Sequence, residues 1–274
     1  MRSAPKTVLV SLAFILYLLP WYVIFARIAG TPLGVDFGML RSAAESAMHL
    51  QNPYTAGPGF YNPPWMLLFM APFAPIPQQV GFVLWTVIGV ASYALAFRRM
   101  GIGWPAAVIL LFSPLAVGNL MFGNYDWLIL LGATLPPAWG IWFMAMKPQL
   151  GVVLASLWIW QSARKGLRSL AILVLPIVTA VLISLLLGYR LPESGTMAWS
   201  ADVWPWGIPV GAILTYFAYR RNDPVLAIAA APFVAPYVVW HSWIAVLLPL
   251  ARNKWALGAG ILASWVFFWW IFVR

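Results

Sequence analysis

Long apolar runs separated by short basic clusters are the feature that most constrains this chain. Runs such as 7–29, 79–97 and 169–187 approach the roughly 20 residues that an α-helix needs to cross about 30 Å of hydrocarbon. Hydrophobic residues make up 63% and charged residues 8% of the sequence, and the mean hydropathy is +0.87. A soluble domain carries about a quarter charged residues, so that class is excluded. The sequence therefore predicts an all-helical, polytopic membrane protein.

The first apolar run, 7–29, follows Arg2 and Lys6 and in this respect is similar to a secretory signal. It is longer than the apolar core of such a signal, and no small-x-small cleavage site closes it. We therefore expect it to remain in the protein as the first transmembrane helix.

Basic residues give the chain a formal net charge of +10, and they gather between the apolar runs. The clusters are Arg2/Lys6, Arg98/Arg99, Arg164/Lys165/Arg168, Arg220/Arg221 and Arg252/Lys254. Basic loops of membrane proteins stay in the cytoplasm, so the clusters predict an orientation in the membrane. A nucleic-acid partner is not expected, because no basic stripe with interleaved aromatic residues is present. The pattern indicates a multi-pass protein of the cytoplasmic (inner) membrane.

With the basic clusters inside, residues 1–274 form a single transmembrane domain with about 8–10 transmembrane or re-entrant helices. An external loop, 30–62, begins near Asp36, and the helical spacing of its apolar residues over 37–50 predicts a helix on the membrane surface. A second external loop is expected at 188–202. The candidate site residues then fall on one side of the membrane and face outward.

Residues 63–97 leave two topologies open. They hold two apolar pieces, 64–74 and 79–97, which prolines separate. Either the first piece is re-entrant, or one basic cluster departs from the positive-inside trend. Proline is frequent, at 23 residues, and it predicts broken helices whose free backbone groups line a cavity.

The chain has no cysteine and only two histidines, His49 and His241. Disulfides and thiolate metal sites are therefore excluded, and a cage of histidines is disfavoured. We expect neither a metal ion nor a cofactor.

Acidic residues are scarce, at six in 274, and Asp36 stands where the first apolar run gives way to a polar loop. A carboxylate held at a membrane surface is a candidate for acid–base chemistry. The alternative role is an N-cap, because an acid before the predicted helix 37–50 also fits that position. The two roles are compatible.

Lys147 lies inside the apolar run 138–160 and is followed by Pro148. A lysine at membrane depth is costly to insert, so it faces a cavity or a partner. An anion such as a lipid phosphate is the natural ligand of such an ammonium group. The alternative is a lysine whose long side chain extends to the headgroup region.

Asn124 and Asp126 follow an apolar run and are either turn residues or groups that bind sugar hydroxyls. Amides and carboxylates are suited to such hydroxyls. His241 lies between two tryptophans at the outer end of another run, which fits either an interfacial histidine or a site residue. The predicted topology places all three on the same side as Asp36.

A series of short motifs follows the chain in an order that is similar to a known family. The motifs are Asp36-Phe37, Asn52-Pro53-Tyr54, Tyr61-Asn62-Pro63-Pro64, Gly123-Asn124-Tyr125-Asp126, Lys147-Pro148 and the stretch 236–243. Together they resemble the GT-C superfamily of integral-membrane glycosyltransferases, and within it the bacterial polyprenyl-phosphate-mannose-dependent mannosyltransferases. Each motif is short, so the specificity comes from their order along 36–250.

The resemblance implies transfer of a sugar from a polyprenyl-phosphate-linked donor to a lipid or glycan acceptor at the outer face of the membrane. Asp36 is then the general base that takes the proton of the acceptor hydroxyl. Lys147 binds the donor phosphate, with assistance from His241 and Arg41. The residues with an implied role in substrate binding are Asn124, Asp126, Tyr54 and Tyr61.

Two departures from the family pattern keep other hypotheses open. Members of the family are usually longer, so a partner subunit is one expected source of further helices. The element at 123–126 is altered, and the segment 188–210 is compact, which fits a small or lipid-linked acceptor or a loss of activity. A non-catalytic membrane subunit of the same fold is the second hypothesis. A transporter is the third, and it predicts paired intramembrane charges and inverted repeats.

Overall fold

The computed structural model describes residues 33–55, 60–189 and 200–272. Within these ranges the chain is helical, and the one β-type pairing is an isolated bridge between Ser200 and Val239. The prediction of an all-helical protein is confirmed for this part of the chain. The predicted first transmembrane helix, 7–29, and most of the second external loop, 188–202, lie outside the described residues.

The first half of the described chain contains mostly short helices. In chain order they are α2 (Val35–Met48), α3 (Met66–Met70), the 3-10 helix η1 (Ala71–Phe73), α4 (Gln78–Arg99), α5 (Trp104–Leu111), α6 (Pro114–Phe122) and α7 (Asp126–Gly132). α2 covers most of the stretch over which the sequence predicts a surface helix, and it packs against α3, η1 and α4. The expected helix within the loop 30–62 is therefore present.

The second half contains both long and short helices. In chain order they are α8 (Pro137–Met146), α9 (Pro148–Arg164), α10 (Leu167–Leu186), α11 (Ile208–Arg221), α12 (Pro224–Val234), the 3-10 helix η2 (Trp240–Trp243), α13 (Ile244–Leu250) and α14 (Lys254–Phe272). α12 packs against α9, α11 and α13 and is buried over most of its length. It is the centre around which the second half assembles.

Two described helices, α4 and α10, are long and apolar enough to cross a membrane. α5 and α6 make a third span if the pair, which is bent by 56°, counts as one. The apolar runs expected to give further spans are divided in the structure. The run 136–160 becomes α8 and α9, and the piece 64–74 becomes α3 and η1, which are too short to cross on their own.

Proline and glycine explain where the helices break. Proline lies in the first turn of α5, α6, α8, α9, α11 and α12, where its missing N–H removes no helical hydrogen bond. α6 ends at Gly123, whose φ of 73° is left-handed and suits glycine at the end of a helix. The breaks bring helix ends, with their polar connecting residues, into the interior of the protein.

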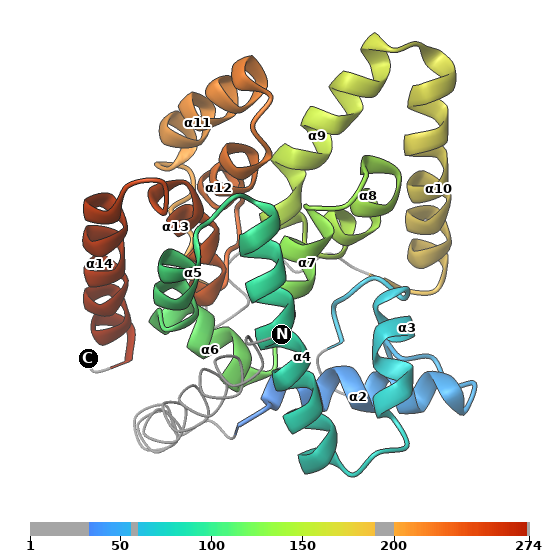
Figure 1. Ribbon diagram of the computed structural model, residues 1–274. Helices are drawn as coiled ribbons and strands as arrows, with labels where there is room; N and C mark the ends of the chain where they lie inside the picture. The colour runs from blue at the N-terminus through green and yellow to red at the C-terminus, as the bar shows by residue number, and fades with distance from the viewer. Residues whose placement is uncertain (1–32, 56–59, 190–199, 273–274) are drawn as a thin grey trace, which may run out of the picture.

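Figure 1 shows α2 lying across the lower part of the molecule, beside the lower part of α4. The C-terminal end of α4 and the turns between α9 and α10, α11 and α12, and α13 and α14 lie away from α2, in the upper half of the view. These are the places where the described basic clusters occur. The fold therefore separates α2 from the basic ends of the helices.

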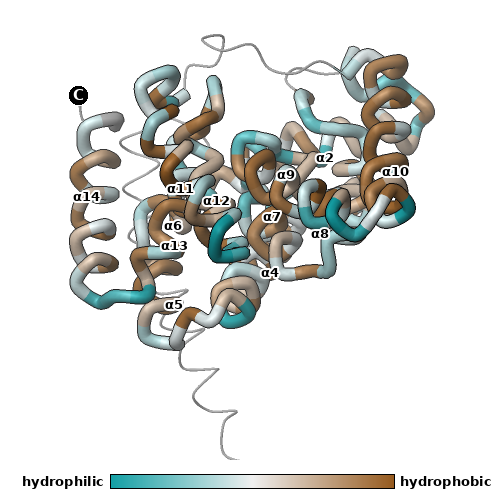
Figure 2. Tube along the Cα trace, turned by 90° about the horizontal axis from the view of Figure 1, so that it is seen from above, coloured by the Kyte–Doolittle hydropathy of each residue, from teal (hydrophilic) through white to brown (hydrophobic). Residues whose placement is uncertain are grey.

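α10 presents apolar side chains to its surroundings. Figure 2 shows it as a largely hydrophobic helix at the edge of the molecule. Leu175 is 61% exposed and Leu182 is 56% exposed. A helix with this much exposed apolar surface is suited to contact with lipid. Together with α4, it identifies the chain as a membrane protein.

Candidate functional site

A cavity of about 650 Å³ lies beside the start of α2. Helix ends and their connections line it, including the break between α8 and α9 and the segment that follows α12. Five of the residues expected at a substrate site contribute to its wall: Asp36, Tyr61, Asn124, Lys147 and His241. They are far apart in the sequence, so tertiary packing alone brings them together.

Asp36 lies in the first turn of α2, and backbone contacts fix its position. Gly34 precedes it with a left-handed φ of 68°, and the Gly34 N–H donates to the Met121 carbonyl at 2.8 Å. Gly34 is the N-cap residue of α2, and no side chain caps the helix. The alternative role of Asp36 as an N-cap is therefore wrong. Phe37 is buried behind it, next to Gly123.

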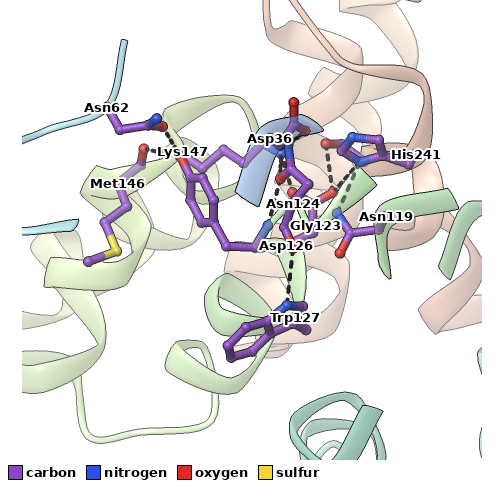
Figure 3. A network of polar contacts seen from close by, with 12 residues as sticks. Asp36, Asn62, Asn119, Gly123, Asn124, Asp126, Trp127, Met146, Lys147 and His241 are labelled. Carbon is purple, nitrogen blue, oxygen red and sulfur yellow. Dashed lines mark hydrogen bonds and ion pairs between the residues drawn. The ribbon is translucent and has the colours of Figure 1, made fainter. Parts of the chain in front are cut away.

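Asn124 connects groups of opposite charge with one amide. Its Nδ2 donates to Asp36 Oδ2 at 2.7 Å, and its Oδ1 accepts from Lys147 Nζ at 2.9 Å. The same Oδ1 accepts from the Tyr125 backbone N–H at 2.7 Å, which fixes the amide orientation. Figure 3 shows this residue between the carboxylate and the ammonium group.

Lys147 lies at the break between α8 and α9, where its φ of −139° and ψ of 77° are not helical. Its Nζ forms an ion pair with Asp126, and the two residues are 3% and 0% exposed. The ammonium group also lies 5.3 Å from the centre of the Tyr125 ring. The alternative in which Lys147 extends to the headgroups is therefore wrong. An ammonium has three N–H donors, and the bonds to Asp126 and Asn124 use two of them.

Asp126 also holds His241 and Ser242. Its Oδ2 accepts from Ser242 Oγ at 2.9 Å and lies 2.9 Å from His241 Nδ1. A carboxylate acceptor requires a hydrogen on Nδ1, so Nε2 is the nitrogen left for another partner. The Asn119 amide lies 3.1 Å from the same Nδ1, and its Oδ1 has no other partner among the described residues.

The environment of Asp36 changes its proton affinity. Burial is the largest influence and raises the pKa of the carboxyl above its ordinary value of 3.8. The hydrogen bond from Asn124 and the nearby His241 and Lys147 act in the opposite direction without cancelling the rise. A carboxylate with a raised pKa holds a proton more tightly than an exposed aspartate. Asp36 is therefore a stronger base than an exposed aspartate.

Arg41 does not lie at the cavity. Its Nη2 donates to the Ala74 carbonyl at 2.7 Å, and its Nε donates to the Ile76 carbonyl at 3.1 Å. A surface ion pair with Glu45, at 3.3 Å, uses the remaining nitrogen. The structure thus places Arg41 away from the cavity that holds Asp36 and Lys147, and its expected assistance at the donor phosphate has no support from its position. Arg41 ties α2 to the segment before α4 and so fixes the helix that carries Asp36.

Tyr54 and Asp126 also lie outside the cavity wall, although both support it. The Tyr54 hydroxyl donates to the Asn62 carbonyl at 2.9 Å, and burial raises the pKa of that hydroxyl. Asp126 is fully buried as the counterion of Lys147. The expected direct contact of these two residues with substrate is therefore not supported by their positions.

Several residues of the site lack an assigned role in the sequence interpretation. They are Asn62, Asn119, Tyr125 and Ser242. The Tyr125 hydroxyl donates to Asn62 Oδ1 and lies 3.3 Å from the Met146 carbonyl, so it joins the predicted loop to the break at Lys147. A signal for Asn119 was available, because a polar amide inside the apolar run 104–120 is unusual. Nothing distinguishes Ser242 in the sequence.

Among the residues that the structure describes, no group of three or more His, Cys, Asp or Glu is arranged to hold a metal ion. No family model, curated protein or solved structure matches the chain. A functional proposal for this protein therefore rests on the chemistry of the cavity. It combines a carboxyl of raised pKa, a buried ammonium group with one remaining donor, and amide and phenol groups in an otherwise apolar wall.

Proposed function

We propose that the protein is a GT-C-type membrane glycosyltransferase that moves a sugar from a polyprenyl-phosphate donor to a lipid or glycan acceptor. Mannose is the sugar that the family resemblance favours. The observation that carries the proposal is that Asp36, Lys147 and His241 line one cavity. They come from α2, from the break between α8 and α9, and from η2, so their convergence is a property of the whole fold.

Asp36 is the base in the proposed reaction. Its Oδ2 is bound by Asn124, which leaves Oδ1 to accept the proton of an acceptor hydroxyl. As this proton moves to Asp36, the acceptor oxygen forms a bond to the anomeric carbon of the donor sugar. The bond from that carbon to the phosphate oxygen breaks, and its electron pair leaves with the polyprenyl phosphate.

Lys147 and His241 stabilise the charge that collects on the leaving phosphate. The third N–H of Lys147 is available for that role. The Nε2 of His241 donates to the phosphate when the imidazole carries a hydrogen on both nitrogens. Both are buried, and an electrostatic contact is stronger in such a site than in water. Asp126 keeps the two groups in place between turnovers and offsets the charge of Lys147.

The rest of the cavity suits an amphiphilic donor. Tyr61 and Asn124 offer hydrogen bonds to sugar hydroxyls, whereas Met39, Val152 and Pro148 form an apolar wall for the isoprenoid chain. A cavity of this size holds a sugar phosphate together with part of the polyprenyl chain attached to it.

The proposed membrane arrangement is multi-pass, with about 8–10 segments in the cytoplasmic membrane and the site open to the outer face. α4 and α10 are the long spans, and pairs of short helices such as α8 with α9 complete others. Support for the orientation comes from the separation of α2 from the basic helix ends in Figure 1, because basic ends face the cytoplasm. A partner subunit remains part of this proposal as a source of further helices.

Transfer of label from radiolabelled polyprenyl-phosphate sugars to membrane lipids tests the proposal. Replacement of Asp36 by Asn keeps the shape but removes the base, so the rate is expected to fall about 10²–10⁴-fold. Glu45→Gln is the matched control, since Glu45 lies on the same helix and is exposed. Equal rates in the Asp36 and Glu45 variants contradict the assignment of the base. If no donor gives transfer, the proposal that the protein is a glycosyltransferase is contradicted.

A non-catalytic, lipid-binding subunit of the same fold is the second candidate. The ion pair between Lys147 and Asp126 favours it, because the ammonium group already has an anionic partner. The transporter hypothesis also predicts paired buried charges, and this ion pair is one such pair. Binding of the polyprenyl-phosphate donor without transfer of its sugar identifies the non-catalytic subunit.

A further inference from the structure

The C-terminal ends of α9 and α11 form a single edge. Gln161 Nε2 donates to Asn222 Oδ1, although the two residues are 61 positions apart. The Trp160 ring lies 5.3 Å from the Tyr219 ring, and the Tyr219 hydroxyl donates to Ser156 Oγ at 2.9 Å. Figure 1 shows both helices ending in the upper part of the molecule. Two basic clusters that are separate in the sequence therefore meet.

We call this surface the basic edge and define it by Arg164, Lys165, Arg168, Arg220 and Arg221. All of these side chains are exposed, and none forms an ion pair with another described residue. The nearest acid in the sequence, Asp223, accepts from Arg252 at 2.6 Å and from the N–H groups at the start of α12. The positive charge of the basic edge is thus not offset by the described part of the chain.

Aromatic rings hold two of the guanidinium groups. Arg164 lies 4.9 Å from the centre of the Trp160 ring, and Arg221 lies 5.1 Å from that of Phe217. A guanidinium placed over a ring keeps its N–H edges free for an anion, which it can bind with two parallel hydrogen bonds. Tryptophan and tyrosine are also typical of the level at which lipid headgroups lie.

The basic edge borders an apolar surface. Leu167, the first residue of α10, is 84% exposed, and the exposed apolar side chains of α10 continue from it. A ligand of the basic edge therefore meets positive charge on one side and hydrocarbon-facing surface on the other. Only an amphiphile with an anionic head matches both.

We propose that the basic edge is a binding site for the headgroup of an anionic phospholipid. The phosphate of the lipid accepts hydrogen bonds from Arg164 and Arg221, and its acyl chains lie along α10. Clusters of basic residues next to transmembrane helices attract anionic lipids through this charge. The site is separate from the cavity at Asp36 and does not depend on the activity of that cavity.

Thermal unfolding of the full chain in neutral detergent tests the site. The midpoint is measured during titration with phosphatidylglycerol, phosphatidylcholine or inorganic phosphate. We expect phosphatidylglycerol alone to raise the midpoint, because binding to the folded state stabilises it. In R164Q/R221Q the apparent affinity for phosphatidylglycerol is expected to fall about thirtyfold, at the typical contribution of one basic residue near an anionic surface.

R99Q/K254Q is the matched control, because it removes two exposed basic residues from other turns. It is expected to keep the wild-type affinity. If both double variants lose the same affinity for phosphatidylglycerol, the site is overturned, because the lipid then responds to the net charge of the protein. Equal stabilisation by phosphatidylcholine overturns it too, and so does competition by inorganic phosphate at the lipid concentration, which identifies a free-phosphate site.

A second measurement needs no variant and can overturn the site even if R164Q/R221Q does not fold. The affinity of the wild-type protein for phosphatidylglycerol is expected to fall as sodium chloride is added, because salt screens exposed charges. An affinity that does not change with salt contradicts binding through the basic edge.

Discussion

Asn124 favours the ionised form of Asp36 through a single hydrogen bond. The bond from Nδ2 stabilises the ionised carboxylate and so lowers a pKa that burial raises. The other end of the amide binds Lys147, which keeps the donor in position. The pKa of Asp36 therefore depends on Asn124.

Replacement of Asn124 by Ala is expected to shift the pH dependence of sugar transfer. The base is active when ionised, so kcat/KM falls as the pH drops below the pKa of Asp36. Loss of the hydrogen bond raises this pKa further, and the acid limb of the profile therefore moves to higher pH. Gln149→Ala is the control, because Gln149 lines the cavity but forms no described bond to Asp36. An acid limb that stays in place in Asn124→Ala shows that another group titrates.

Lys147 and Asp126 depend on each other because both are buried. A charge left alone in such a place costs more than the pair contributes, so removal of one partner is worse than removal of both. This buried pair differs from the exposed pair of Arg41 with Glu45, which water screens.

Asp126→Asn is expected to lower the free energy of unfolding by about 3–5 kcal/mol, since Lys147 loses its counterion. Adding Lys147→Met to this variant is expected to recover much of the loss. Thermal or denaturant unfolding in detergent measures both. Glu45→Gln, which breaks the exposed pair, is expected to cost about 0–1 kcal/mol. Strictly additive effects of the two buried substitutions count against a coupled pair.

At the scale of helices, a glycine allows α2 to approach the end of α6. A Cβ atom on Gly123 would lie 2.5 Å from the Phe37 Cβ and 3.0 Å from the Phe37 backbone nitrogen. The backbone of α2 cannot yield without moving the first turn that carries Asp36. Gly123 is thus a requirement of the site as well as of the helix end.

Gly123→Ala is expected to reduce both stability and transfer, because it combines backbone strain with displacement of α2. Gly101→Ala separates the two effects. Gly101 also has a left-handed φ, of 82°, but nothing lies within 4 Å of the added Cβ. It is expected to cost only the strain, about 1–2 kcal/mol, and to leave transfer unchanged in the folded fraction. If the two variants behave alike in unfolding and activity assays, the contact with Phe37 is unimportant.

Helices were predictable from the sequence where the length of an apolar run, or the spacing of its apolar residues, is enough to define them. The spans α4 and α10 follow from their apolar length, and α2 follows from the spacing of its apolar residues. Which prolines end a helix was not predictable. Pro148 begins α9 after a break, whereas Pro176 and Pro232 lie inside α10 and α12. Packing against neighbouring helices decides between these outcomes, and a single sequence does not contain that information.

For the molecule as a whole, the sequence indicated the site residues but not their partners. Asp36, Lys147 and His241 attract notice because charge and imidazole are rare in apolar surroundings. The bond of Asp126 to Lys147 depends on how α7 meets the break after α8, and this is set by tertiary packing. The position of Arg41 away from the cavity has the same origin, since carbonyls of the segment before α4 bind it.

The proposed orientation of the whole molecule rests on the positive-inside trend and can be measured by cysteine labelling. The natural chain has no cysteine, so each single substitution gives an unambiguous signal. Leu50 is 96% exposed after the end of α2, and Lys165 is exposed in the turn between α9 and α10. Because Lys165 belongs to a basic cluster and Leu50 lies on the side of Asp36, the two are expected on opposite faces.

A membrane-impermeant maleimide added to intact cells is therefore expected to label Leu50→Cys and to leave Lys165→Cys unlabelled. Permeabilised cells are expected to show labelling of both, which proves that each cysteine is accessible. Labelling of both variants in intact cells would place the basic edge and α2 on the same side. The reverse pattern would put the Asp36 cavity in the cytoplasm, where a donor presented at the outer face cannot reach it. Labelling thus tests the side of the membrane independently of the reaction.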